Sequence, residues 1–179
     1  AKVAHGLSQA PEWLWIKGRS IGTGHVIYHH KNTAAPETDY LALHTNDATY
    51  DAIFLNDTAP DAKCFTLGPT GYSTNNDDAT YVAYCWHSVA GYSKFGSYTG
   101  NGNADGTFIM TGFKPAWIMI KRTNSAANWY MDDTARNPLN PTVNTINADT
   151  TSAESSNANL AALDILSNGF KKIASYVAS

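Results

Sequence analysis

The stretch FGSYTGNGNADGTFIMTGFKPAWIMIKR, residues 95–122, decides the fold class. Short runs of apolar and aromatic residues alternate in it with a turn rich in Gly and Asn at residues 100–106 and with a Gly-Phe-Lys-Pro corner at residues 112–115. Such runs, separated by such turns, are typical of β-strands joined by tight connections. The stretch predicts strands at residues 92–99, 107–110 and 116–121.

The second half of this stretch repeats the start of the chain. Pro11–Lys17 matches Pro115–Lys121 at a spacing of 104 positions (115 − 11), and the run before it, Val3–Leu7, matches Ile109–Phe113. A period of this length is far longer than the repeat of a solenoid. The chain is therefore expected to consist of two related copies of one β-rich unit.

The rest of the chain extends this pattern with about a dozen short strand-like runs in all. The strongest β signal is the aromatic run TYVAYCWH at residues 80–87. Only residues 152–163 could form a helix. Further matches between the copies are expected for His25–His29 with Asn128–Asp132, Leu41–Thr45 with Val143–Asn147, Phe65–Leu67 with Leu163–Leu166, and residues 79–83 with residues 174–178.

These observations predict an all-β fold, an antiparallel β-sandwich of jelly-roll or lectin-like type built from two sequence-related halves. The halves span residues 1–90 and 91–179 and form one compact domain or two tightly packed sandwiches. The first copy lacks a counterpart of residues 95–100, so the chain begins one strand into a repeat. A missing strand leaves an unpaired sheet edge, which needs cover from this chain, another subunit or sequence beyond this stretch. We therefore expect a homo-oligomer.

Composition excludes several classes of partner. Charged residues make up 15% of the 179 residues and the net charge is −3, which gives no electrostatic footprint for nucleic acid or anionic lipid. No apolar run approaches the roughly 18–20 residues of a membrane span. The chain starts at Ala1 rather than Met, so either the initiator was removed or this is a piece of something longer.

No group of residues stands out as catalytic, and we expect no enzyme activity. Cys85 and His87 share a strand face and could form a thiol–imidazole pair, but a buried thiol with a histidine at the strand end is the favoured interpretation. Glycosidase chemistry needs two carboxylates about 5–10 Å apart, and the three glutamates and the pair Asp132–Asp133 nominate none.

No metal or cofactor site is expected either. His25, His29, His30 and His44 could cluster, but surface histidines that tune an interface near pH 6.5 are favoured over a ligand set. The run Asn-x-Asn-x-Asp-Gly at residues 101–106 imitates a calcium loop, yet its twelfth position is Gly112 rather than Glu, so a turn is favoured. Cys64 and Cys85 are expected to be buried thiols rather than a disulfide or a zinc site.

Four tryptophans are the candidate interface or ligand-stacking aromatics: Trp13, Trp15, Trp117 and Trp129. Aromatic faces can stack on sugar rings, but Trp13 and Trp117 recur at equivalent positions of the two copies, which favours packing in a core or a subunit interface.

The chain resembles a repeated β-domain of virion proteins from tailed phages, especially marine phages. The resemblance covers nearly the whole chain, and its motifs are structural rather than catalytic. The residues that carry it are Thr80–Tyr84, Tyr98-Thr99-Gly100-Asn101-Gly102, Gly112-Phe113, Pro115, Ile120-Lys121, Trp129 and Asp133-Thr134-Ala135-Arg136.

The resemblance implies a lectin-like sandwich located on the virion, with other capsid or tail proteins as partners. Because the chain is short and lacks the first Tyr-Thr-Gly-Asn-Gly strand, it fits a head-decoration or knob-like protein, a tail-appendage subunit or a fibre fragment. We expect a non-enzymatic structural protein of the virion surface that assembles by protein–protein contacts. The alternative is a carbohydrate-binding module of a tail fibre that attaches to host surface glycans.

Overall fold

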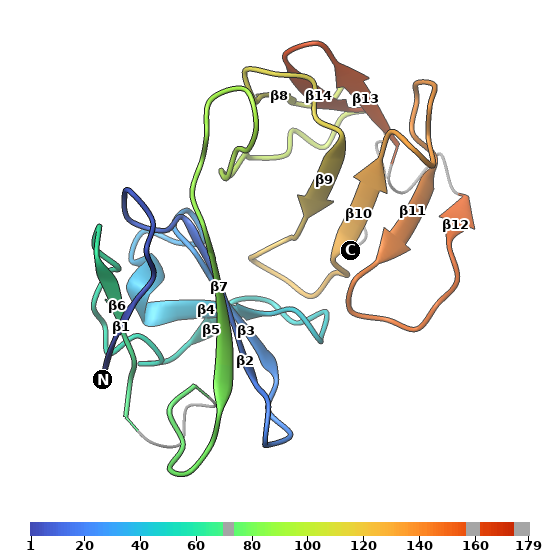
Figure 1. Cartoon of the computed structure of the whole chain (residues 1–179). Coiled ribbons are helices and arrows are strands. Elements are labelled where there is room, and N and C mark those ends of the chain that lie inside the picture. The colour runs from blue at the N-terminus through green and yellow to red at the C-terminus, as the bar shows by residue number, and fades with distance from the viewer. Residues whose placement is uncertain (70–73, 157–161, 174–179) are drawn as a thin grey trace. The chain divides into compact units, whose positions relative to one another are not determined.

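A computed structural model describes residues 1–69, 74–156 and 162–173, and it confirms the predicted all-β class. The chain divides into two compact units. Unit 1 comprises Ala1–Ser88, Lys94–Ser97 and Thr123–Ala126, and unit 2 comprises Val89–Ser93, Tyr98–Arg122 and Ala127–Ser179. Figure 1 shows the strands of unit 1 in blue to green and those of unit 2 in yellow to red.

Unit 1 contains a five-stranded antiparallel sheet in the order β5–β4–β3–β2–β7. Its strands are β2 (Trp13–Gly18), β3 (His25–His29), β4 (Asp39–Ala42), β5 (Tyr50–Asp51) and β7 (Tyr81–Trp86), and the 3₁₀ turn η1 (Pro36–Thr38) precedes β4. A second, two-stranded sheet pairs β1 (Lys2–Ala4) with β6 (Cys64–Thr66). The strand β2 lies between β3 and β7, as its two apolar faces predict.

The core of unit 1 lies between these two sheets, which gives the unit a sandwich arrangement. One face of the large sheet contributes Leu14, Ile16, Val26 and Tyr28, and Phe65 of β6 packs against them together with the loop residues Phe54 and Leu55. Burial of each such apolar side chain stabilises the fold by about 1.5–3 kcal/mol. Because side chains alternate along a strand, the opposite face of the sheet carries Trp13, Trp15 and Lys17 of β2.

Unit 2 is built in the same manner. A four-stranded sheet has the order β12–β11–β10–β9, and a three-stranded sheet has the order β13–β14–β8. Ile118 of β9 packs with Leu163, Ile165 and Phe170 of the smaller sheet to form the core. The strand bounds are β8 (Phe108–Met110), β9 (Trp117–Ile120), β10 (Tyr130–Asp133), β11 (Asn144–Asn147), β12 (Ser155–Ser156), β13 (Leu163–Leu166) and β14 (Gly169–Lys172).

Several contacts recur at the 104-residue spacing. The His30 amide donates to the Glu12 carbonyl at 2.9 Å, and the Thr134 amide donates to the Ala116 carbonyl at 3.0 Å. The Lys17 ammonium donates to the Thr23 carbonyl at 3.4 Å, as that of Lys121 does to the Ala127 carbonyl at 2.6 Å. A duplication predicts such recurrence, although the duplication itself stays a hypothesis.

The register of the repeat differs from the sequence prediction. Trp13 pairs with His29 and Trp117 pairs with Asp133, so His29 corresponds to Asp133 and not to Asp132. Likewise β1 pairs with β6 and β8 pairs with β14, so the counterpart of Phe65–Leu67 lies in β14 rather than at Leu163–Leu166. A slip of one residue reverses the face of every side chain, and sequence similarity over such short strands does not fix it.

The predicted strand at residues 92–99 is wrong. Tyr92 lies in a turn, Ser93 forms an isolated bridge with Val89, and residues 94–99 belong to no strand. The second copy therefore has no strand at residues 95–100 that the first copy could lack. The expectation that a missing strand leaves an unpaired sheet edge loses its basis.

The candidate helix at residues 152–163 is also wrong where the structure describes it, since β12 and the start of β13 lie there. Residues 157–161 of it, and the predicted repeat at residues 174–178, lie outside the described residues. Within the described ranges the single helical segment is η1, and no helix has the length and hydropathy of a membrane span.

Candidate functional site

The outer face of the five-stranded sheet in unit 1 gathers aromatic side chains from three strands. β2 contributes Trp13 and Trp15, whose neighbours Leu14 and Ile16 point into the core. We call this surface the aromatic face and define it as Trp13, Trp15, His25, His29, Tyr84 and Trp86. Cross-strand pairing explains the grouping, because Trp15 lies opposite Tyr84, and Trp13 lies opposite both Trp86 and His29.

The rings of the aromatic face contact one another in series. The Trp15 ring lies 5.2 Å from the Tyr84 ring and 5.5 Å from the His25 ring, measured between centroids. The Tyr84 and Trp86 rings are 5.8 Å apart and nearly parallel. With 44% of Tyr84 and 39% of Trp86 exposed, the face presents aromatic surface to solvent rather than burying all of it.

The other end of the face is held by polar contacts around Glu12. Trp13 meets the His29 ring edge-on at 5.8 Å and the Phe95 ring at 6.1 Å. The Ser88 amide and hydroxyl both donate to the Glu12 carboxylate, and the Ser88 hydroxyl accepts from the Phe95 amide at 3.1 Å. These bonds fix the segment at Lys94–Ser97 beside the sheet although it is not a strand.

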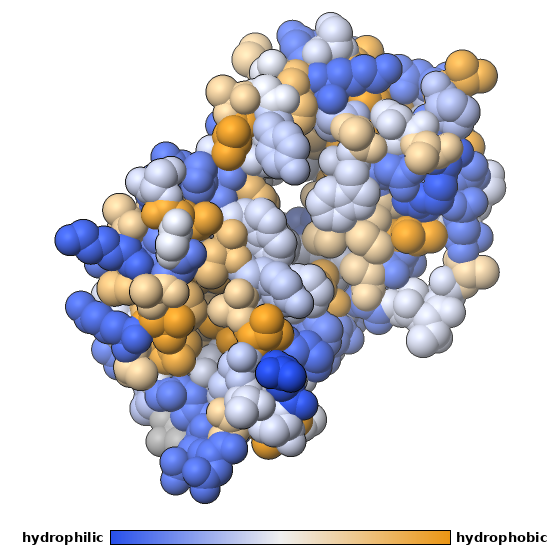
Figure 2. Space-filling view, viewed as in Figure 1, coloured by the Kyte–Doolittle hydropathy of each residue, from blue (hydrophilic) through white to orange (hydrophobic). Residues whose placement is uncertain are grey.

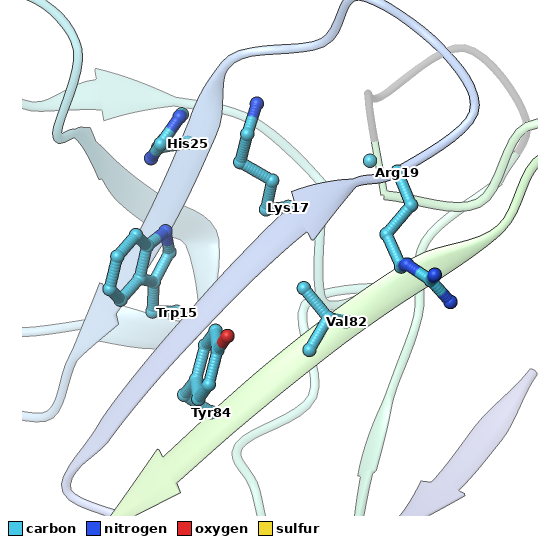
Figure 3. A pocket seen from close by; sticks show the side chains of 7 residues that line it. Trp15, Lys17, Arg19, His25, Val82 and Tyr84 are labelled. Atoms are coloured by element: carbon cyan, nitrogen blue, oxygen red, sulfur yellow. The ribbon is translucent and has the colours of Figure 1, made fainter.

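A shallow open groove of about 480 Å³ crosses one end of the aromatic face (Figure 3). Figure 3 shows Trp15 and Tyr84 side by side, the Lys17 ammonium on the side of His25, and the Arg19 guanidinium on the side of β7. The residues that line the groove are Trp15, Lys17, Gly18, Arg19, His25, Val82 and Tyr84.

Burial and neighbouring cations act on the histidines of this face. Burial lowers the pKa of His25, with Lys17 and His44 adding to the effect. Burial, and to a lesser extent His30, lowers the pKa of His29 to about 4, although Glu12 opposes this. Both imidazoles are therefore neutral at pH 7, and the fixed positive charges of the groove belong to Lys17 and Arg19.

The structure separates the four candidate tryptophans. Trp13 and Trp15 lie on the aromatic face, and Trp117 on β9 is 55% exposed. Trp129 is only 1% exposed, with the Lys121 ammonium 5.9 Å from its ring centroid, so it offers no face to a ligand or a partner. It belongs to unit 2 and directly precedes β10, but it is not one of the residues that pack with Ile118 in the core of that unit.

The four histidines form two pairs rather than one cluster. His25 and His44 have rings 6.0 Å apart, and the His25 amide donates to Nδ1 of His44. His29 and His30 have rings 5.4 Å apart. Within the described ranges, no group of three or more His, Cys, Asp or Glu residues has metal-binding geometry.

The side chains of Cys85 and His87, the candidate thiol–imidazole pair, make contacts with other groups. Cys85 packs against the core of unit 1 opposite Leu14, and burial raises the pKa of its thiol. His87 follows the end of β7, where its Nδ1 lies 2.8 Å from the Ser88 carbonyl and its Nε2 3.5 Å from the Ser8 hydroxyl. Cys64 and Cys85 are both free thiols.

The run at residues 101–106 is a turn whose side chains bond to its own backbone. Oδ1 of Asn101 accepts from the Asn103 amide, and Oδ1 of Asn103 accepts from the Asp105 amide. The Asp105 carboxylate pairs with Lys171. At Gly106 the amide donates to the Lys172 carbonyl, and a Cβ would approach that oxygen to 2.3 Å, which explains the glycine.

Sequence reasoning missed Tyr84 of the aromatic face, and it missed Lys17, Arg19 and Phe95 beside that face. Tyr84 and Trp86 alternate along one strand, which is a visible signal. Their position beside Trp15 and Trp13 depends on β7 pairing with β2 over a separation of about 70 residues (84 − 15 = 69). No local pattern reports such a pairing.

The chain belongs to the family described as Domain of unknown function (DUF7483), whose model matches residues 1–178. No curated protein and no solved structure matches the chain. The aromatic face and its groove therefore have to be interpreted from their own chemistry.

Proposed function

We propose that the protein is a non-enzymatic structural protein of a phage particle surface, which assembles with other virion proteins and with copies of itself through the β7 edge of unit 1. The observation that carries this proposal is β7 itself. It ends the five-stranded sheet, and no described strand pairs with its second side. Its sequence, Tyr-Val-Ala-Tyr-Cys-Trp, contains no charged residue.

An exposed edge strand without charge is a template for pairing with another chain, and natural proteins usually block such edges with lysine, proline or a cover. Strand addition at an open edge is also a common mode of protein recognition. The aromatic face continues from this edge, and exposed Tyr and Trp are enriched in protein interfaces. Ala83, Tyr84 and Trp86 of β7 are themselves exposed to solvent.

The location on a phage particle is supported by the resemblance of the sequence to virion domains, above all at Tyr98–Gly102 and Asp133–Arg136. The structure supports a role by contact rather than chemistry, because Cys85 packs in a core and the carboxylates Glu12 and Asp133 are engaged in structural hydrogen bonds. Hydrophobic and hydrophilic residues are mixed on the face of the molecule that Figure 2 shows.

The test uses the variant Ala83→Lys, which adds a charge in the exposed middle of β7. Leu139→Lys is the matched control, because it adds the same charge at an exposed position of unit 2. We expect the wild-type chain and the control to sediment as oligomers and to bind phage particles stripped of this protein, and Ala83→Lys to do neither. Oligomers and particle binding that survive Ala83→Lys would overturn the assignment to β7.

A second candidate function is a carbohydrate-binding module that attaches to host surface glycans. The groove favours it, because the solvent-exposed Tyr84 stands beside Trp15 and aromatic surfaces bind the apolar faces of sugars. Labelled chain added to intact host cells tests it. Saturable binding that free sugars compete away supports this function, and binding to stripped particles alone overturns it.

A further inference from the structure

We infer that the groove of unit 1 binds an acidic saccharide, with the carboxylate or sulfate of one sugar residue held by Arg19 and its ring lying against Tyr84 and Trp15. This inference rests on the second candidate function, since it names the class of glycan that the module would bind.

The charge of the groove selects an anion. Its lining residues include Lys17 and Arg19 but no Asp or Glu, and no carboxylate among the described residues lies within ion-pair distance of either cation. The whole chain carries a net charge of −3, so this positive site stands out from its surroundings. An acidic ligand would supply the missing counter-charge.

The backbone on both sides of Arg19 is fixed, which prepares its side chain for binding. The Arg19 amide donates to the Thr80 carbonyl at 2.7 Å, and the Ser20 hydroxyl accepts from the Thr80 amide at 2.9 Å. On the other side, the Gly18 amide donates to the Thr23 hydroxyl at 3.1 Å. A guanidinium on a fixed turn presents planar donors that match carboxylate and sulfate oxygens.

One polar atom of the groove lining has no partner. Nε1 of Trp15 is buried, and no acceptor for it exists among the described residues. A buried donor without an acceptor is costly, so native proteins rarely keep one without a reason. An oxygen-rich ligand that reached the edge of this indole would satisfy it.

Comparison with unit 2 shows which groove residues recur in both units and which occur in unit 1 alone. Lys17 and Lys121 make the same bond to a turn carbonyl, so this lysine is part of the shared framework. The positions 104 residues after Trp15, Arg19 and His25 hold Met119, Thr123 and Trp129. The indole, the guanidinium and the imidazole are thus not required by the sheet, which is why Arg19 rather than Lys17 is the residue to test.

The experiment measures binding of three matched probes to the full chain by titration calorimetry: galacturonate oligomers, sulfated galactose oligomers and neutral galactose oligomers of equal length. We expect at least one acidic probe to bind more tightly than the neutral one. Arg19→Gln should weaken acidic binding about ten-fold, as loss of one charge-assisted hydrogen bond implies, and leave neutral binding unchanged. The two acidic probes distinguish a carboxylate from a sulfate as the recognised group.

Two further variants make the outcomes distinct. Lys31→Gln removes the same charge from an exposed position outside the groove, and equal weakening by Lys31→Gln and Arg19→Gln would overturn the inference in favour of non-specific attraction. Equal affinity for acidic and neutral probes, with sensitivity to Tyr84→Ala alone, would overturn the anion preference but keep the carbohydrate-binding function. Binding of none of the probes would overturn both.

Discussion

At the scale of single residues, histidine 29 shows how one side chain can make this fold sensitive to acid. Its Nδ1 accepts a hydrogen bond from the Lys31 amide at 3.0 Å, and a protonated imidazole cannot accept that bond. Burial of the ring, and then its neighbour His30, disfavour a positive charge on it, although Glu12 opposes this. The fold therefore holds the imidazole in its neutral form.

The pKa of about 4 for His29 predicts a loss of stability in mild acid. The unfolded chain binds a proton at an ordinary histidine pKa near 6.5, and the folded chain resists protonation until about 4, so the stability falls as the pH drops through this window. The full effect is at most about 3–4 kcal/mol, from roughly 1.4 kcal/mol for each unit of the shift from 6.5 to about 4. Urea unfolding between pH 7 and pH 4.5 measures it.

The matched variant is His29→Gln, whose side-chain oxygen can still accept from the Lys31 amide but does not titrate. We expect its stability to change less than that of wild type over the same pH range. Equal slopes for the two proteins would show that other groups, such as carboxylates, account for the acid sensitivity.

The four candidate tryptophans show how much of the site could be predicted from the sequence at the scale of single residues. Residue type identified all four as packing or binding aromatics, and Trp13 and Trp15 do lie on one exposed-side face. Trp129 was expected to match the buried residue Val26, whereas the pairing of Trp117 with Asp133 aligns it with His25 of the aromatic face. It is buried all the same, so neither residue type nor the match between the copies accounts for its burial.

At the scale of elements, the turn after β10 shows what the run Asp133-Thr134-Ala135-Arg136 does. Oδ1 of Asp133 accepts from the amides of Ala135 and Arg136, at 3.0 and 2.8 Å. The Arg136 guanidinium donates to Asp133, to Glu154 and to the Met131 carbonyl. The motif closes a turn and ties it to the segment before β12, so its role is structural.

Arg136→Lys is predicted to destabilise unit 2 by about 1–3 kcal/mol, because one ammonium cannot reach three acceptors in three directions. Hydrogen exchange of the β10 and β11 amides measures the effect. Arg19→Lys is the control, since Arg19 has no ion pair among the described residues. Equal protection in Arg136→Lys and wild type would contradict a structural role for the guanidinium.

The segment at residues 92–99 shows why some elements could not be predicted. Its aromatic residues, Tyr92, Phe95 and Tyr98, favour a strand by residue type, but they recur every third residue, and a strand also needs a partner. Here the Phe95 amide bonds to the Ser88 hydroxyl, and the Phe95 ring packs on Trp13. By contrast, the run at residues 80–87 was predicted correctly because β2 pairs along its length. The local sequence pattern gives a segment its tendency to form a strand. Pairing with a distant segment decides whether the strand forms.

At the scale of the whole molecule, each unit has its own core, made by residues of that unit. The sequence predicted two halves that divide near residue 90, and this division stays a prediction, because the two units interleave along the chain beyond Ser88. It could not predict that Lys94–Ser97 and Thr123–Ala126 belong to unit 1, because their membership depends on contacts such as the Thr49 amide with the Thr123 carbonyl. The sequence also left open whether the chain is one cooperative domain or two.

Paired core substitutions distinguish these alternatives. Leu163→Ala in unit 2 and Leu14→Ala in unit 1 remove the same atoms from fully buried sites, at a cost of about 2–5 kcal/mol each. Because the two cores share no residues, Leu163→Ala is expected to speed hydrogen exchange in β13 and β14 and to leave β2 and β3 protected. Leu14→Ala should do the reverse. If either substitution accelerates exchange in both units equally, the chain unfolds as one cooperative domain, and a contact made through unit 1 would then depend on the core of unit 2 as well.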